Sequence, residues 1–595
     1  MKKAIWSLGA IALAICNLHG QAYVHQKLGS GFSNLSTGIL TSLGYPAWSG
    51  ELASSPGDVD VFLITGNNNV SASVLGTGRD ASPADHHPIY GLLWEGSGSA
   101  NGNKLDVFLN STNLSAPILG ADRFAAAFRF AVDGRPIWYG GGTNNGNNID
   151  IFVGNTNLTA SLLGSNRDAV PMALSPNNIL LWDGAGSAIG SLNRDVFTTN
   201  LNSMASTNVS QSVLGSARFA IAGFLNDSGT PLWSGAGTNN NDYNDVFFGS
   251  TNISASVLGG LTAVRDATPH GVSQSGSSNT LIWVGRASST NWFYDAFATS
   301  VPGSSVNISA SILGTTGRES LPIAVQGAAV LWEGVGSNTS FNNDVFVTTP
   351  GATRNLSTNR FGSGGTGTRV STGRAVDSSG NALWEGKHSS TGNNENLFYY
   401  SWSANSSTNL TQEATGSTRR SQVLATNNAM QVLWAVRNAA DTEWEVYLST
   451  PNLPTSLQGN LNIPGYVGNL SQVQVTARLV DPLTGNVAST HTGSGNSSGG
   501  YSVGVTPGLW GVRISASGCL TRAFPVQRLL GATTIDLDLI LGDVNQDNVI
   551  DDADLLAVLF DFGQTGATPA DLNGDGVVDD ADLLTVLFNF GQTGE

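Results

Sequence analysis

Residues 133–167 read DGRPIWYGGGTNNGNNIDIFVGNTNLTASLLGSNR, and variants of this stretch recur along most of the chain. Its landmarks are Trp138, an acidic-apolar-aromatic triplet that begins at Asp150, a segment NLTASLLG that begins at Asn157, and Arg167. Glycine and asparagine fill the gap between the tryptophan and the triplet, as is typical of turns. Short apolar runs between such turns predict β-strands, and the segment from Asn157 is predicted as one of them.

The unit recurs from residue 34 to 453 with a period of 44 to 52 residues. Its tryptophans are Trp48, Trp94, Trp138, Trp182, Trp233, Trp283, Trp332, Trp384 and Trp434. Its triplets begin at Asp60, Asp106, Asp150, Asp195, Asp245, Asp295, Asp344, Asn396 and Glu445. Its arginines are Arg79, Arg123, Arg167, Arg218, Arg265, Arg318, Arg369 and Arg419.

A period of this length with four short strands per unit is typical of a β-propeller blade. Nine tryptophans predict a ring of about nine blades, and eight blades with a split closing blade are the alternative. The first unit has no arginine, so its opening strand must come from residues 23–40 or from the far end of the chain. The stretches DGRPIW (133–138) and DSGTPLW (227–233) resemble TolB-like or PD40-type propeller repeats. This resemblance implies a fold and no particular activity.

The repeated residues have structural and functional interpretations. We expect the tryptophans to fill wedges between blades, with sugar-stacking platforms as the alternative. We expect the repeated acids and arginines to form bidentate pairs, with a ring of channel arginines for an anionic substrate as the alternative. Four further acids directly follow a blade tryptophan, which favours a scaffold role: Glu95, Asp183, Glu333 and Glu385. Catalytic residues remain unknown, because sugar hydrolysis needs an asymmetric carboxyl pair and the visible acids recur regularly.

Two copies of one loop pattern lie near the C-terminus: DVNQDNVIDDAD at 543–554 and DLNGDGVVDDAD at 571–582. Each copy places oxygen donors at the positions that calcium requires, with a main-chain carbonyl at position 7. The sequence therefore predicts two Ca²⁺ ions, held by Asp543, Asn545, Asp547, Val549, Asp551 and Asp554, and by Asp571, Asn573, Asp575, Val577, Asp579 and Asp582.

Helical spacing follows each loop. Leu555, Val558, Leu559 and Phe562 are repeated as Leu583, Val586, Leu587 and Phe590, and we expect the two stripes to be buried against each other. Aspartate at position 12, the missing helix before the loop and the duplication resemble type I dockerin modules. The resemblance implies a cohesin partner or another cell-surface partner, contacted through loop positions 10 and 11, which are Asp552, Ala553, Asp580 and Ala581.

Between the repeats and the loops, residues 471–479, 499–514 and 533–541 have strand patterns and predict a β-sandwich. The hairpin in 499–514 resembles carboxypeptidase-regulatory-like modules, which implies a spacer. We expect Tyr501 and Trp510 in its core, with a carbohydrate platform as the alternative.

Residues 1–22 combine Lys2 and Lys3, an apolar stretch and a closing Ala22, which is typical of a secretory signal peptide. We therefore expect a secreted or extracellular surface protein. The net charge is −17, and residues 541–595, with eleven Asp, one Glu and no Lys or Arg, contribute −12 of it. No basic patch suggests nucleic acid, and no later stretch is long enough to span a membrane.

The predicted fold class is mainly β, with a signal peptide (1–22), a β-propeller (23–454), a β-sandwich (455–541) and an α-helical calcium module (542–595). This organisation favours a secreted, non-catalytic protein with a calcium-dependent attachment tail and a propeller that binds a polysaccharide, another glycan or a protein. One alternative is a glycan-active enzyme, a polysaccharide hydrolase or lyase, with its site in the propeller mouth. Another is a structural surface or matrix protein.

Overall fold

The computed structural model describes residues 21–190, 193–259, 264–287, 293–362 and 369–595. It is mainly β and divides into two compact units: Lys27–Leu448, and Ser449–Glu595 together with the N-terminal residues up to Gln26. Most of the predicted signal peptide, residues 1–20, lies outside the described residues. Among the described residues, no helix has the length and apolar composition needed to cross a membrane.

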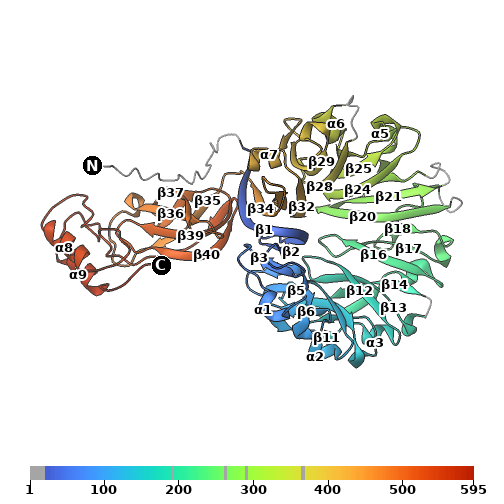
Figure 1. Ribbon diagram of the computed structural model, residues 1–595, viewed down its shortest axis with the longest axis horizontal. Helices are drawn as coiled ribbons and strands as arrows, with labels where there is room; N and C mark the ends of the chain where they lie inside the picture. Colours follow the sequence, from blue (N-terminus) through green and yellow to red (C-terminus); the bar gives the residue numbers. More distant parts are fainter. Residues whose placement is uncertain (1–20, 191–192, 260–263, 288–292, 363–368) are drawn as a thin grey trace. The chain divides into compact units, whose positions relative to one another are not determined.

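The larger unit is a β-propeller of nine blades in its described residues, and seven of these blades have four strands of their own (Figure 1). Seven blades follow one another in sequence, and their strands are β4 (Asp80–His87), β5 (Gly91–Ser97), β6 (Asp106–Leu109), β7 (Thr112–Asn113); β8 (Phe124–Phe130), β9 (Pro136–Gly141), β10 (Asp150–Val153), β11 (Thr156–Asn157); β12 (Asp168–Leu174), β13 (Ile179–Ala185), β14 (Arg194–Asn200), β15 (Ala205–Asn208); β16 (Phe219–Leu225), β17 (Pro231–Ala236), β18 (Asp245–Phe248), β19 (Thr251–Asn252); β20 (Arg265–Ser275), β21 (Ser278–Ala287), β22 (Asp295–Val301), β23 (Ser305–Asn307); β24 (Glu319–Gln326), β25 (Ala329–Val335), β26 (Asp344–Thr349), β27 (Ala352–Asn355); β28 (Val370–Val376), β29 (Ala382–Lys387), β30 (Asn396–Ser401) and β31 (Ser406–Asn409).

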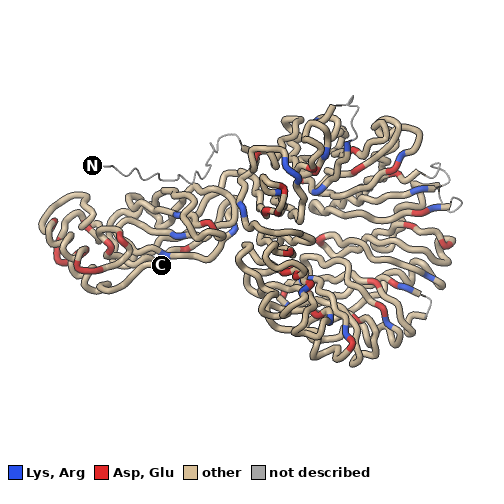
Figure 2. The backbone as a smooth tube through the Cα atoms, viewed as in Figure 1, with Lys and Arg blue, Asp and Glu red and all other residues tan. Residues whose placement is uncertain are grey.

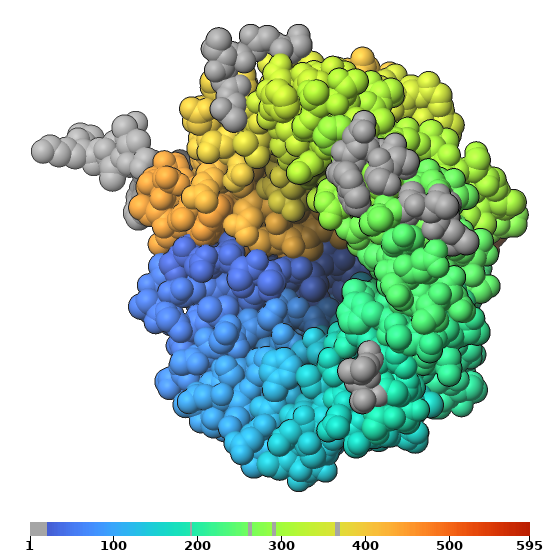
Figure 3. All heavy atoms as spheres, turned by 90° about the vertical axis from the view of Figure 1, so that its right-hand side faces the viewer, coloured from blue at the N-terminus to red at the C-terminus, as the bar shows by residue number. Residues whose placement is uncertain are grey.

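One long strand closes the ring. The strand β1 (Tyr23–Leu40) is paired on one side with β2 and on the other with β34. It thus opens the first blade, which continues with β2 (Pro46–Leu52) and β3 (Val59–Leu63), and completes the last blade, which contains β32 (Ser421–Thr426), β33 (Val432–Arg437) and β34 (Trp444–Pro451). The opening strand of the first unit therefore comes from residues 23–40, which was one of the two predicted sources, and not from the far end of the chain. Figure 3 shows this closure as blue segments beside orange ones.

The nine repeat tryptophans are fully buried on the second strands of the blades, each with 0% of its surface exposed. Each stacks on the aromatic residue of the following triplet; Trp138 and Phe152, for example, have ring centroids 4.2 Å apart. The wedge interpretation is therefore confirmed, and the sugar-platform alternative is wrong because no ring face is accessible.

The segments predicted as strands from Asn157 and its equivalents are mostly single helical turns. These helices are α1 (Ala72–Leu75), α2 (Ala116–Leu119), α3 (Ala160–Leu163), α4 (Gln211–Leu214), α5 (Ala310–Leu313), α6 (Leu356–Phe361) and α7 (Leu410–Thr415). In α3, Asn157 Oδ1 accepts the main-chain N–H of Ala160 at 3.0 Å, which turns the chain out of the strand, and Leu163 is fully buried. Side-chain hydrogen bonds of this kind compete with strand pairing, which is why the prediction was wrong.

In the smaller unit, β35 (Ser456–Asn462), β36 (Gln474–Val480), β37 (Val487–Gly495), β38 (Gly500–Gly504), β39 (Gly508–Ala516), β40 (Arg522–Leu529), β41 (Ala532–Thr534) and β42 (Leu537–Asp538) pair as one continuous sheet. The helices α8 (Asp552–Phe560) and α9 (Asp580–Phe588) follow the two loops. Tyr501 and Trp510 are 3% and 8% exposed and belong to the core, so neither is a carbohydrate platform. Val558 and Val586 of the helices belong to the same core as the sheet.

Candidate functional site

Seven of the repeated acids form ion pairs with the arginine that precedes the next blade. Asp150 accepts hydrogen bonds from Arg167 Nε at 2.5 Å and Nη2 at 2.9 Å, and a third from Thr159 Oγ1 at 2.7 Å. The equivalent pairs are Asp60–Arg79, Asp106–Arg123, Asp195–Arg218, Asp245–Arg265, Asp295–Arg318 and Asp344–Arg369. The prediction of bidentate pairs is confirmed for these seven. The alternative of an anion-binding arginine ring is wrong for them, because each guanidinium is bound to a buried carboxylate.

The acids that follow a blade tryptophan link consecutive blades. Each accepts the main-chain N–H of a residue in the next inner strand: Ala127 to Glu95 at 2.8 Å, Ala222 to Asp183 at 3.0 Å, Gly373 to Glu333 at 2.9 Å and Val423 to Glu385 at 2.8 Å. Buried polar groups need such partners. The scaffold role predicted for these four acids is therefore confirmed.

The first C-terminal loop is closed by its own side chains. Asp543 Oδ2 accepts the N–H of Asn548 at 3.1 Å, and Asn548 turns the chain at position 6 with a φ of 74°. Asp554 accepts the N–H groups of Val544, Asn545 and Asp551 at 2.7, 3.1 and 3.0 Å. These bonds hold position 12 over the start of the loop.

The second loop repeats this arrangement. Asp571 Oδ2 accepts the N–H of Gly576 at 3.0 Å, and Asp582 accepts those of Asn573 and Asp579 at 3.0 Å each. The helix N-termini are capped identically, because Asp551 and Asp579 each accept an N–H two residues on, at 2.8 Å. Figure 2 shows acidic residues concentrated in this part of the smaller unit.

The residues of the loops fit a hard cation. Asp543 is 3% exposed and Asp554 0% exposed, yet Asp543 Oδ1 has no hydrogen-bond partner, and residues 541–595 contain no Lys or Arg. Burial first, and then the neighbouring Asp554 and Asp547 charges, raise the pKa of Asp543, as expected for acids crowded without a cation. Asparagine and carbonyl oxygens complete each predicted donor set. No group of three or more His, Cys, Asp or Glu side chains placed to hold a metal is present in the described residues.

The two loop-helix units are related by a reciprocal pairing. Val549 of the first loop forms a bridge with Thr593 after α9, and Val577 of the second forms one with Thr565 after α8. Each loop is therefore closed by the segment that follows the other helix.

The helices do not bury the whole predicted stripe. Val558 and Val586 are fully buried, whereas Leu559, Phe562, Leu587 and Phe590 are 47–50% exposed. The expectation that all four positions of each stripe are buried is therefore wrong. The helices, of nine residues each, pack against the core through Leu555, Val558, Leu583 and Val586, which leaves the outer positions in solvent. The predicted partner residues Asp552, Ala553, Asp580 and Ala581 are exposed.

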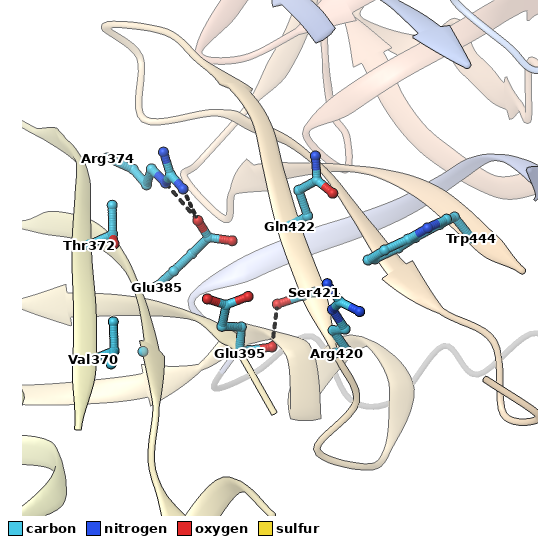
Figure 4. Close-up of a pocket in the computed structure, with 10 residues that line it drawn as sticks. Val370, Thr372, Arg374, Glu385, Glu395, Arg420, Ser421, Gln422 and Trp444 are labelled. Atoms are coloured by element: carbon cyan, nitrogen blue, oxygen red, sulfur yellow. Dashed lines mark hydrogen bonds and ion pairs between the residues drawn. The ribbon is translucent and has the colours of Figure 1, made fainter. Parts of the chain in front are cut away.

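The propeller contains a polar cavity of about 140 Å³ between β28 and β32. Figure 4 shows Arg374, Glu385 and Glu395 of one blade beside Arg420, Gln422 and Trp444 of the next. Arg374 Nε donates to Glu385 Oε2 at 2.6 Å. Burial, outweighing the nearby Arg374 charge, raises the pKa of Glu385. Glu395 and Arg420 were not identified as candidate site residues from the sequence. The signal that could have indicated Glu395 is the next residue, Asn396, which stands where the other units have an acid.

No protein-family model matches the sequence, and no curated protein matches it. One similar solved structure is a type II cohesin-X-dockerin complex from Acetivibrio cellulolyticus, with 21% identity over 24% of this chain and 97% of that chain and a TM-score of 0.20. A second is the β-propeller domain of the Trilobed protease from Pyrococcus furiosus, with 9% identity, 55% and 92% coverage and a TM-score of 0.26. A third is an oligogalacturonate lyase in complex with manganese, with 10% identity, 72% and 98% coverage and a TM-score of 0.25. The similar structures thus include enzymes, but these TM-scores are too low to assign an activity.

Proposed function

We propose that the C-terminal unit is a calcium-dependent docking module that attaches an exported propeller to a cohesin-type or cell-surface partner. The observation that carries this proposal is a duplicated apolar surface on α8 and α9. Leu556, Leu559 and Phe560 are 50%, 49% and 83% exposed, and their equivalents Leu584, Leu587 and Phe588 are 46%, 48% and 81% exposed. We call these two sets the first and the second docking stripe.

Each docking stripe continues the loop residues that were predicted to contact a partner. Ala553, Leu556 and Phe560 follow one another at spacings of three and four residues, so they share one face of α8. Phenylalanine side chains this exposed are unusual in a soluble protein and are typical of a protein interface. Because the stripes are equivalent, a partner can bind either of them in two opposite orientations.

Calcium would neutralise the crowded acids and fix the N-termini of α8 and α9. Hard cations prefer the carboxylate, amide and carbonyl oxygens that each loop supplies. The chemistry that the ions contribute is structural, since metal binding and folding are coupled in such modules.

For the propeller we propose ligand binding without catalysis. Glu385 and Glu395 line one cavity, and this observation favours the alternative of a glycan-active enzyme. However, both oxygens of Glu385 accept hydrogen bonds from the scaffold, Oε2 from Arg374 and Oε1 from the Val423 N–H. A general acid for glycoside cleavage must instead direct its carboxyl group at the glycosidic oxygen of the substrate. A structural surface or matrix role is the third candidate, and it requires no ligand in the propeller.

The docking proposal is tested with the full-length chain and recombinant type I and type II cohesin domains, by titration calorimetry in calcium and in EDTA. We expect binding in calcium only. Phe560→Ser or Phe588→Ser alone should lower affinity about twofold, since one of two equivalent stripes remains, whereas the double variant should not bind. Ile89→Ser, at a propeller side chain that is 79% exposed, is the matched control. Equal binding in EDTA, or by the double variant, would contradict the proposal.

A further inference from the structure

The propeller repeat is constant in its framework and variable at one position. The residue before each triplet is apolar in the first three units and mostly polar in the later ones: Val59, Leu105, Ile149, Arg194, Asn244, Tyr294, Asn343, Glu395 and Trp444. The framework tryptophans are present in all nine units, and the acid–arginine pairs are present in the first seven. A scaffold position needs one side chain in every blade, so the variation indicates a different role.

The main chain at this variable position is held in the same way from blade to blade. Tyr294 forms a parallel bridge with Glu319 at the start of the next inner strand, and Asn343 forms one with Val370. In the next unit, the carbonyl of Glu395 accepts the N–H of Ser421 at 2.8 Å. Only the side chains differ, and each lies at the end of a blade where the next inner strand begins.

Two cavities occur at equivalent places along this end. The cavity between β28 and β32 has Glu395 and Trp444 at the variable positions. A second cavity, of about 500 Å³, lies between β20 and β24 and has Tyr294 and Asn343 there, with His270 and Glu319 on the inner strands. Together they form an arc of polar side chains over the sixth to ninth blades, which we call the polar arc.

The cavity between β28 and β32 is charged but balanced. It contains the carboxylates of Glu385 and Glu395 and the guanidinium groups of Arg374 and Arg420. Arg374 and Glu385 form an ion pair, whereas the Glu395 carboxylate and the Arg420 guanidinium have no hydrogen bond or ion pair among the described residues. The Arg420 guanidinium lies 5.8 Å from the centre of the Trp444 ring. One free acceptor and one free donor group thus face a small polar space.

Such a space suits hydroxyl groups. A hydroxyl can donate to Glu395 and accept from Arg420 at the same time, and hydrogen bonds to charged groups are the strong ones. The balanced charge gives no preference for an anion or a cation. The second cavity is lined also by Val284, Leu321 and Val335, so it offers apolar as well as polar surface. Two cavities at equivalent places favour a ligand that also repeats, which distinguishes a sugar polymer from a single amino acid or peptide end.

We propose that the polar arc is the binding site for a neutral oligosaccharide, with one sugar unit seated between Glu395 and Arg420. This inference deepens the binding role proposed above for the propeller and is independent of the docking stripes. The side chains that bind are those that depart from the repeat. The framework acids and arginines only position them.

The test uses the full-length protein and titration calorimetry with cellohexaose and xylohexaose as neutral probes and hexagalacturonate as the acidic one. We expect at least one neutral hexaose to bind more tightly than hexagalacturonate. Glu395→Gln and Arg420→Ala should each weaken that binding about tenfold or more. Both side chains are exposed, so the variants should unfold at the wild-type temperature. The matched control is Lys104→Ala, because Lys104 is a basic residue with a 37% exposed side chain next to the variable position Leu105 of the second blade, outside the polar arc.

Three outcomes would overturn the proposal: no binding of either neutral hexaose, tighter binding of hexagalacturonate, or unchanged binding by both arc variants. The titration is repeated in EDTA, where the affinity should stay the same because the loops are not involved. Cohesin binding is scored separately, so failure of the polar arc and failure of the docking stripes are distinguishable.

Discussion

Lys27 on the first strand of the propeller and Glu445 on the last form an ion pair, with 2.6 Å between Nζ and Oε1. Glu445 is the triplet acid of the ninth unit, and its partner is a lysine on the neighbouring strand β1 rather than an arginine before the next inner strand. The pair joins residues that are 418 positions apart in sequence. The closure of the ring therefore includes an ion pair.

Removing this pair should weaken the closure. Lys27→Met should lower the free energy of unfolding by about 0.5–1 kcal/mol, a small value because the two side chains are 38% and 18% exposed. Urea unfolding of the calcium-saturated chain measures it. Lys104→Met, which removes the more exposed pair with Asp122, is the control. An equal loss of unfolding free energy in both variants would show that the Lys27–Glu445 pair stabilises the protein no more than the exposed pair of Lys104 and Asp122.

Neutralising an interior repeat acid should cost far more. Asp150→Asn leaves the guanidinium of Arg167 partly buried without a counter-charge, and breaking such a pair costs about 3–5 kcal/mol. We expect about 3 kcal/mol by urea unfolding, because the Arg167 side chain keeps 12% exposure. Asp122→Asn, at an exposed side chain, should change little.

In the eighth blade, Asn396 stands where the other interior blades have an aspartate. The substitution Asn396→Asp therefore tests whether each position is fitted to the charge of its own residue. The side-chain amide of Asn396 donates to the carbonyls of Asn394 and Arg419 at 3.1 and 3.3 Å. Asn396→Asp removes that donor and places a charge beside two carbonyl oxygens, so it should destabilise the protein. A stabilised Asn396→Asp variant would contradict this interpretation of the site.

Stability should pass through a maximum in mild acid. Burial raises the pKa of Glu385, Asp183 and Glu95, so these groups bind protons more tightly when folded, and the fold gains stability as pH falls through their raised pKa values. For Asp150, burial alone would raise the pKa, but hydrogen bonds from Arg167, Thr159 and Asn157 outweigh it and lower the pKa. That stabilisation is present above the unfolded pKa of about 4 and is lost as pH falls further.

The measurement is the urea midpoint of the propeller transition between pH 7 and pH 3. We expect the urea midpoint to rise modestly as the pH falls from 7 towards the unfolded carboxyl pKa of about 4, and to fall below it. In the Glu385→Gln variant, the urea midpoint should rise less as the pH falls, independently of how much stability the variant loses at pH 7. A urea midpoint that falls steadily from pH 7 in both the wild type and the Glu385→Gln variant would contradict the raised pKa of Glu385.

Calcium should stabilise the smaller unit as a whole, because α8 and α9 share one core with the sheet. Titration calorimetry of the full-length chain should give two sites, and Asp543→Ala or Asp571→Ala should each remove one. Asp552→Ala and Asp580→Ala, at exposed loop positions outside the donor set, should retain both sites. Without calcium, the thermal transition of the smaller unit should shift down while that of the propeller stays. Fewer than two sites in the wild type would refute the predicted ligand sets.

The sequence by itself determined the repeat and limited the propeller to eight or nine blades, and it also supplied the calcium donor positions, which stay a prediction. These features are encoded in local spacing: a buried tryptophan, an acid and an arginine recur at fixed intervals because each blade must satisfy the same contacts. The acid–arginine pairing was predictable for the same reason.

Only the tertiary structure decided which surfaces meet. It showed that β1 completes the last blade, that the segments after the triplets turn into helices, and that Val558 is buried while Leu559 is exposed. It also brought Glu395 and Arg420 to one cavity from different blades. Such relationships depend on contacts between segments far apart in sequence, and a periodic pattern within one segment carries no information about its distant neighbours.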